Sequence, residues 1–179
     1  MLEHLRASLD PTPSPVAAPG DQLAAVMLLL TDESDPRIVL TRRHEDLSRH
    51  PGEIAFPGGL PHPEDTSLVD TALRETEEEI GVARALIEVL GALDPVHTHV
   101  SGILIVPFVG LLGQYSSFTV NRTEISDVFD VPVSRLAEAE IETPFERDGQ
   151  SFVGYRYDVD ARIIWGATGR IVHDFLGRL

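Results

Sequence analysis

The most informative stretch of this 179-residue chain is Arg74-Glu75-Thr76-Glu77-Glu78-Glu79-Ile80-Gly81-Val82. From Leu68 to Ile80 apolar side chains recur at steps of three and four residues, which is the spacing of one helix face. Gly81 is a typical terminator because glycine adopts the left-handed conformation at low cost. The pattern therefore predicts a helix from residue 66 or 67 to residue 82, packed on a sheet by its apolar face.

Three glutamates of this stretch gather on one side of the predicted helix. At about 100° per residue, Glu75, Glu78 and Glu79 fall within an arc of about 100°, whereas Glu77 projects away from them. Like charges three or four residues apart cost about 0.2–0.5 kcal/mol per pair, and only Arg74 offers local compensation. A hard divalent cation such as Mg²⁺, which prefers oxygen ligands, would offset this repulsion. The alternative is an ordinary solvated helix face.

The order of residues around this helix resembles the signature of the Nudix hydrolases. The matching residues are Gly59, Arg74, Glu75, Glu78, Glu79, Gly81 and Val82. Three features depart from the signature: the loop before Arg74 is one residue longer, Asp65 or Glu64 replaces the first glutamate, and Thr76 occupies an apolar position. The departures affect the loop alignment and leave the helix alignment intact.

The resemblance implies roles for these residues. Glu75 and Glu79 would be the principal ligands of Mg²⁺ or Mn²⁺, and Glu78 a ligand or a water-activating carboxylate. Arg74 would orient the glutamates. The carbonyl of Gly58 would be a further ligand, because a missing side chain lets the backbone approach metal and diphosphate closely.

Glu124 has two interpretations. Nudix enzymes often bring another carboxylate from a downstream loop, which makes Glu124 a candidate catalytic base or metal ligand. Asn121 followed by Glu124 also matches a variant capping box that opens a helix over 123–129. Both interpretations stay open at this point.

A second set of residues is similar to the signature of the coenzyme A pyrophosphatase branch of the family. It consists of L-T-x-R, a histidine, a glycine and F-P-G-G, with the spacing kept from Thr41 to Gly59, although His44 replaces a small residue. This branch hydrolyses the diphosphate of coenzyme A or acyl-coenzyme A to 3′,5′-ADP and 4′-phosphopantetheine. The substrate-binding residues expected here are Arg42, Arg43, Arg49, His50, Gly58 and Gly59. Guanidinium groups suit phosphate oxygens, but the first two arginines could instead pair with Glu45 and Asp46.

Two other functions remain as alternatives. One is a Nudix pyrophosphatase for another nucleoside diphosphate derivative, such as ADP-ribose, NADH or a dinucleoside polyphosphate. The other is a non-catalytic nucleotide-sensing domain with the same fold. Trp165 is expected to anchor the core or the entry to the last helix, in preference to stacking on a base.

The composition excludes several classes of protein. The 14 basic residues are all arginine and face 29 acidic ones, a formal charge of −15 that argues against nucleic-acid or acidic-membrane binding. Without lysine there is no Schiff-base chemistry, and without cysteine there are no disulfides or thiolate sites. No apolar run is long enough for a membrane span, and no signal peptide is recognised. We expect a soluble cytoplasmic protein, monomer or homodimer, whose partner is a small nucleotide substrate.

Strand-like and helical segments alternate along the chain. Residues 1–21 are proline-rich, which predicts an N-terminal arm. The resemblance implies that residues 22–179 form a single Nudix domain. The expected class is α/β, a Nudix-type α/β/α sandwich with a mixed central β-sheet. Strands are expected over 22–30, 37–41, 54–56, 87–93 and 103–112, with a hairpin over 142–158. Helices are expected over 123–129, 133–139 and from about 165 or 167 to 179.

Overall fold

The computed structural model describes residues 2–47, 50–98, 102–113, 117–147 and 149–179. Its larger sheet has eight strands: β1 (Gln22–Thr31), β2 (Arg37–Arg43), β3 (Ile54–Ala55), β4 (Gly58–Gly59), β5 (Ile87–Ala92), β6 (Val96–Thr98), β7 (Ile103–Leu112) and β8 (Ile125–Pro132). A three-stranded sheet follows, formed by β9 (Glu140–Arg147), β10 (Gln150–Val159) and β11 (Arg162–Ile164). The helices are α1 (Leu2–Ser8), α2 (Leu68–Ile80), α3 (Val133–Ala139) and α4 (Gly166–Leu176), with a 3₁₀ turn η1 (Arg84–Leu86).

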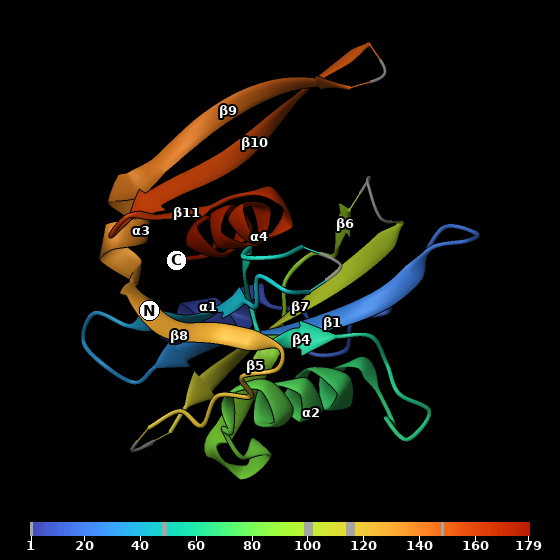
Figure 1. Ribbon diagram of the computed structural model, residues 1–179, viewed down its shortest axis with the longest axis vertical. Coiled ribbons are helices and arrows are strands. Elements are labelled where there is room, and N and C mark those ends of the chain that lie inside the picture. Colours follow the sequence, from blue (N-terminus) through green and yellow to red (C-terminus); the bar gives the residue numbers. More distant parts are fainter. Residues whose placement is uncertain (1, 48–49, 99–101, 114–116, 148) are drawn as a thin grey trace.

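The central strands of the larger sheet are covered on both faces (Figure 1). β1 pairs in parallel with β7 along its whole length and antiparallel with β2 and β4, so the sheet is mixed. Because successive side chains of a strand point to opposite faces, Met27 and Leu29 pack with α2, and Leu28 and Leu30 with the core beneath α4. The α/β/α sandwich expected from the sequence is confirmed.

The first residues of the chain pack against this core. Leu5 and Leu9 are buried, and the backbone of Asp10 forms two hydrogen bonds with Ala92, of 2.9 and 2.8 Å. Gly91 permits this approach, because a Cβ atom there would lie 2.7 Å from the Cβ of Leu9. The start of the expected N-terminal arm is thus a helix, α1, followed by a segment attached to the sheet.

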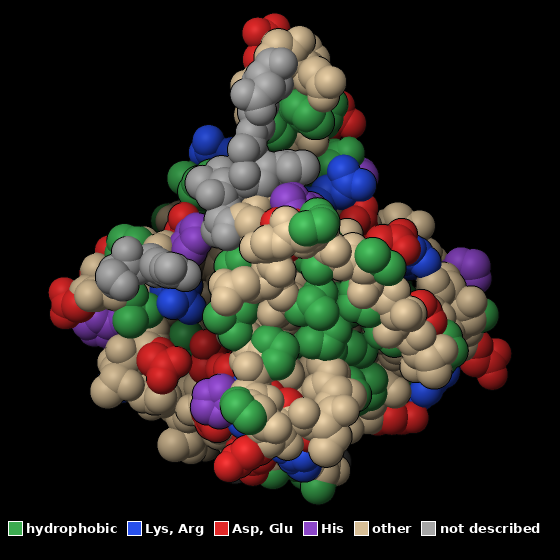
Figure 2. Space-filling model, turned by 90° about the vertical axis from the view of Figure 1, so that its right-hand side faces the viewer, with side chains coloured by type: hydrophobic (Ala, Val, Ile, Leu, Met, Phe, Trp, Pro, Cys, Tyr) green, Lys and Arg blue, Asp and Glu red, His purple; other side chains and the backbone are tan. Residues whose placement is uncertain are grey.

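The β9–β10 hairpin stands away from the body of the molecule (Figures 1 and 2). Its base is fixed to α4: Tyr155 stacks on His173 with ring centroids 3.5 Å apart. The buried hydroxyl of Tyr157 donates to Glu140 over 2.5 Å, and burial together with this carboxylate raises the pKa of Tyr157.

Within the described ranges, no helix is both long and apolar enough to cross a membrane.

One predicted helix is wrong. Residues 123–129 do not open a helix, and the chain from Ile125 enters β8, which pairs antiparallel with β2 from Arg37 to Arg43. Asn121 accepts hydrogen bonds from the backbone and the hydroxyl of Thr123, which form a local turn. Backbone partners supplied by a distant strand override the local helix signal.

Candidate active site

Helix α2 is capped at both ends, by Ser67, near which the pattern placed its start, and by Gly81, the predicted terminator. The side chain of Ser67 accepts from the backbone N–H of Asp70 at the N-terminus. Gly81 adopts φ +71°, and its N–H donates to the carbonyl of Glu77. The carbonyls of Glu79 and Ile80, which the helix leaves free, accept from the segment just before β8 over 2.9 Å each. This contact brings the chain around Glu124 to the carboxylate end of α2.

Arg74 is the centre of an ionic network. Its Nε and Nη2 donate to the two oxygens of Asp65 over 2.9 and 3.0 Å, a bidentate pair. Its Nη1 donates to Glu75 over 2.9 Å and to Glu78 over 3.0 Å. The Arg74 side chain is only 16% exposed, and its contacts with Asp65 and Glu75 are partly buried, whereas its contact with Glu78 lies at the surface. One guanidinium therefore holds two of the three signature glutamates.

Asp65 is the residue whose role the sequence did not reveal. It is the half-buried acid of the loop, whereas Glu64 is exposed. The Thr71 hydroxyl and the His62 N–H also donate to it, each over 2.8 Å. The hydrogen bonds from Arg74 and His62 hold the pKa of Asp65 well below its usual range, so the group stays ionised. The available signal was its place six residues after Gly59, where the family signature has a glutamate.

Glu79 is only 3% exposed, so it does not lie on an ordinary solvated helix face, which was the alternative left open by the sequence. Its Oε2 accepts the N–H of Gly58 over 3.3 Å. Burial, then the negative charge of Glu75, raise the pKa of Glu79 to about 8, against the Gly58 hydrogen bond and the charge of Arg43. Metal-free Glu79 is therefore largely protonated at pH 7 and ionises readily beside a cation.

The two glycines of β4 let the strand lie against these carboxylates. A Cβ on Gly59 would sit 2.6 Å from Oε1 of Glu75. A Cβ on Gly58, whose φ is +156°, would sit 2.3 Å from the carbonyl oxygen of Ala25. Neither position accepts a side chain without displacing backbone or a glutamate.

Glu75 and Glu124 complete the acidic cluster. Burial raises the pKa of Glu75, and the charges of Glu78 and Glu124 add to it, against the contacts with Arg74. The charge of Glu124 also acts on Glu79, so this exposed carboxylate lies near both helix residues. The capping-box helix is absent, although Nδ2 of Asn121 donates to Oε1 of Glu124 over 3.3 Å, and the role of Glu124 at the site stays a prediction.

The donor set suits a divalent cation. In the part of the chain that the structure describes, no three Asp, Glu or His side chains are grouped closely enough to hold a metal as they stand. Arg74 and the Gly58 N–H hold the signature glutamates instead. All the side chains are oxygen donors. The pKa of Glu79 is raised by burial first and by the negative charge of Glu75 second, and a divalent cation such as Mg²⁺ or Mn²⁺ would offset both.

The basic residues expected to bind phosphate do not form one patch. On β2, Ile38 and Leu40 face the α4 side and Val39 the α2 side, so alternation places Arg42 on the α4 side. Arg43 acts on Glu79 and so faces the carboxylates. The β2–β8 register shifts between these two arginines.

The rest of the basic loop is only partly described. His50 lies at φ 54°, and its Nδ1 is 2.8 Å from Oε2 of Glu53. Arg49 lies outside the described residues. Nε of Arg42 and Nε of Arg43 are buried without a hydrogen-bond partner among the described residues. Each of these two nitrogens has the capacity to bind an acceptor that the described residues do not supply.

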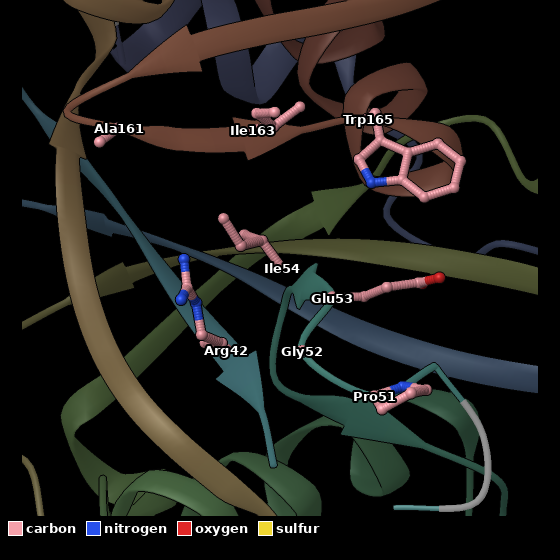
Figure 3. Close-up of a pocket in the computed structure, with 8 residues that line it drawn as sticks. All are labelled: Arg42, Pro51, Gly52, Glu53, Ile54, Ala161, Ile163 and Trp165. Atoms are coloured by element: carbon pink, nitrogen blue, oxygen red, sulfur yellow. The ribbon is translucent and has the colours of Figure 1, made fainter. Parts of the chain in front are cut away.

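The sequence predicted that Trp165 anchors either the core or the entry to the last helix, and the structure places it at the helix entry and outside the core. It is the N-cap residue of α4, yet 57% of it is exposed. Its indole lies at an open pocket that Arg42 also lines (Figure 3).

Comparison with known proteins agrees with this geometry. A family model described as NUDIX domain matches residues 21–151. An uncharacterized Nudix hydrolase NudL from Photorhabdus laumondii is 36% identical over 165 residues, covering 91% of this chain and 88% of that protein. A MutT/nudix family protein from Enterococcus faecalis superimposes with TM-score 0.58 at 18% identity, over 93% of this chain and 64% of that one. The NUDIX domain of Shewanella oneidensis NrtR, complexed with ADP ribose, gives TM-score 0.53 at 23% identity, over 76% and 85%.

At 23% and 18% identity, the two solved structures show only that this chain shares their fold. The family model spans most of the chain, and the bacterial relative covers nearly all of it. The α2 carboxylates, the Arg74 network and the β4 glycines lie within the matched residues. The chain belongs to the Nudix hydrolase family.

Proposed function

We propose that this chain is a divalent-metal-dependent pyrophosphatase that hydrolyses the diphosphate of coenzyme A or acyl-coenzyme A. The products would be 3′,5′-ADP and (acyl-)4′-phosphopantetheine. The observation that carries the proposal is the buried Glu79, held against the Gly58 N–H beside Glu75 and sensitive to the charges of Glu124 and Arg43. A solvated helix face would bury no carboxylate and would need no glycine pair against it.

The chemistry that a bound Mg²⁺ or Mn²⁺ supplies is neutralisation of the diphosphate and easier deprotonation of water. Glu75, Glu78, Glu79 and the Gly58 carbonyl would hold the ion. Arg74 would keep Glu75 and Glu78 oriented, with Asp65 fixing the guanidinium in turn. Arg43, which acts on Glu79, would stabilise negative charge on the phosphates. Glu124 is our candidate to accept the proton of the attacking water, because it is exposed and lies near both Glu75 and Glu79.

We favour coenzyme A over other diphosphates as the substrate because of a feature of the sequence. The residues from Thr41 to Gly59 keep the spacing of the coenzyme A branch. Coenzyme A carries a ribose 3′-phosphate in addition to its diphosphate, and an acidic protein needs local cations to hold both. Arg42 and Arg43 supply cations on the two sides of β2, and no described carboxylate forms an ion pair with either.

The principal alternative is a Nudix pyrophosphatase for another nucleoside diphosphate derivative. The NrtR domain with ADP ribose has the same fold, and the Thr41–Gly59 segment is the feature that favours coenzyme A here. Non-catalytic nucleotide sensing would need only binding, whereas all three signature glutamates are kept.

The deciding experiment is a panel of substrates with Mg²⁺ or Mn²⁺, with products identified by mass spectrometry. It contains coenzyme A, 3′-dephospho-coenzyme A, ADP-ribose, NADH and a dinucleoside polyphosphate. We expect coenzyme A to give 3′,5′-ADP with the highest kcat/KM and the dephospho compound to be poorer. Equal rates for those two, or faster hydrolysis of another member, would exclude the coenzyme A assignment. Hydrolysis undiminished in Glu79→Gln would exclude the site.

A further inference from the structure

An open pocket of about 420 Å³ lies between the loop before β3 and the β10–β11 turn, on the α4 side of the sheet. Its walls come from segments far apart in sequence, with Arg42 on one side, Glu53 and Ile54 beneath, and Ile163 and Trp165 above (Figure 3). Its volume is within the range of small-ligand pockets. None of these side chains has a place in the hydrolysis proposed above, except that Arg42 was expected among the phosphate contacts.

The apolar wall of this pocket is exposed to solvent. Trp165 is 57% exposed and Ile163 47%, although each would gain by burial. An indole beside a shallow pocket offers a flat face on which a planar ring stacks, a contact that contributes about 1–3 kcal/mol for a nucleobase.

The opposite wall offers a cation. Nε of Arg42 is buried and has no hydrogen-bond partner among the described residues, and no described carboxylate forms an ion pair with this guanidinium. In a protein of formal charge −15, most arginines find an acid easily; Arg37, for example, pairs with Asp130. An arginine left without one is available to an external anion.

The pocket is connected to the carboxylates by a short stretch of chain. Ile54 lies in β3, which pairs with β2 at Arg42, and Gly58 of β4 follows four residues later. On the other face of β2, Arg43 acts on Glu79. A ligand at the pocket and a diphosphate at α2 would therefore be held by neighbouring residues of the same two strands.

We infer that this pocket binds the nucleoside end of the substrate, with a purine base stacked on Trp165 and a ribose phosphate held by Arg42. Naming that end adenosine 3′-phosphate rests on the proposed function. The pantetheine arm of coenzyme A has neither a planar ring nor a charge, so it would use neither the indole nor the guanidinium. Glu53 is placed to accept a hydrogen bond from an amino or hydroxyl group.

The test uses the only tryptophan of the chain as its own probe. Wild-type protein in EDTA is titrated with 3′,5′-ADP, 5′-AMP and uncharged pantetheine while indole emission is recorded. We expect a saturable change with both nucleotides, tighter for 3′,5′-ADP, and none with pantetheine. No saturable change with either nucleotide, or a change with pantetheine, would overturn the inference.

Two variants separate the contacts. Arg42→Ala should weaken 3′,5′-ADP at least fivefold and leave 5′-AMP within twofold, whereas Arg135→Ala, at an exposed arginine of α3, should change neither. Trp165→Ala, followed by calorimetry, should weaken both nucleotides about fivefold or more, and Trp165→Phe should restore most of that loss. Equal weakening of both nucleotides by Arg42→Ala would refute the phosphate contact. If Trp165→Ala does not fold, Trp165→Phe and Arg42→Ala still show whether the pocket binds the nucleotides.

Failure of this inference is distinguishable from failure of the proposed function. Hydrolysis of coenzyme A without any response of Trp165 would reject the pocket assignment and leave the proposed function standing. Binding of 3′,5′-ADP without hydrolysis of any member of the panel would reject the proposed function and leave the pocket assignment standing.

Discussion

Replacing Glu79 by glutamine should remove a pH dependence from the stability of the metal-free protein. Burial raises the pKa of Glu79 from 4.5 to about 8. Between these two values the unfolded chain is ionised at this position while the folded chain keeps the proton. The folded state then binds more protons, so the free energy of unfolding falls as pH rises through this window and levels off above pH 8.

The size of the effect follows from the same rise in pKa. At about 1.4 kcal/mol for each tenfold change in proton affinity, the full cost of ionised Glu79 is at most about 5 kcal/mol, reached above pH 8. Glutamine keeps an oxygen that accepts the Gly58 N–H and carries no charge at any pH. We therefore expect the free energy of unfolding of Glu79→Gln to depend less on pH than that of wild type. The advantage of the variant over wild type should be about 2–4 kcal/mol larger at pH 9 than at pH 5.

Urea unfolding in EDTA at pH values from 5 to 9 measures this difference. Glu77→Gln on the same helix is the matched control, because the Glu77 side chain is 49% exposed and lies near Arg84 instead of the cluster. Adding Mg²⁺ at pH 8 should stabilise wild type and not Glu79→Gln. Parallel stability curves for wild type and Glu79→Gln would show that Glu79 carries no burial penalty and would refute the reasoning.

Three further outcomes are expected. Asp65→Asn removes the charge that anchors Arg74. We expect kcat to fall about 10- to 100-fold and the Mg²⁺ concentration needed for activity to rise. An unchanged dependence of the rate on Mg²⁺ concentration would contradict this. Gly59→Ala places a methyl group 2.6 Å from Oε1 of Glu75, so turnover should drop at least about tenfold while the melting temperature moves little, and wild-type kinetics would be the contrary result. Tyr157→Phe breaks a 2.5 Å hydrogen bond in the hairpin base, so urea unfolding should show a loss of about 1–3 kcal/mol with kcat unchanged; equal stability would argue that the bond contributes nothing.

The sequence alone determined the helix and the character of its acidic face. Apolar spacing, a serine at the start and Gly81 at the end act within a few residues, so α2 and its carboxylates could be predicted. The buried position of Thr76, an apolar site in the family pattern, is explained by its hydroxyl, which donates to the carbonyl of Ala72 over 2.7 Å.

The tertiary structure decided which groups meet. The β-strand in place of the expected 123–129 helix and the exposure of Trp165 depend on contacts between segments far apart in the chain. The partnership of Asp65 with Arg74 depends on how the loop before α2 folds back on the helix. The separation of Arg42 from Arg43 depends on strand alternation and on the sheet having a different neighbour on each face. Local periodicity fixes where a side chain points along its own helix or strand, whereas burial, charge environment and pKa come from whatever the fold packs beside it.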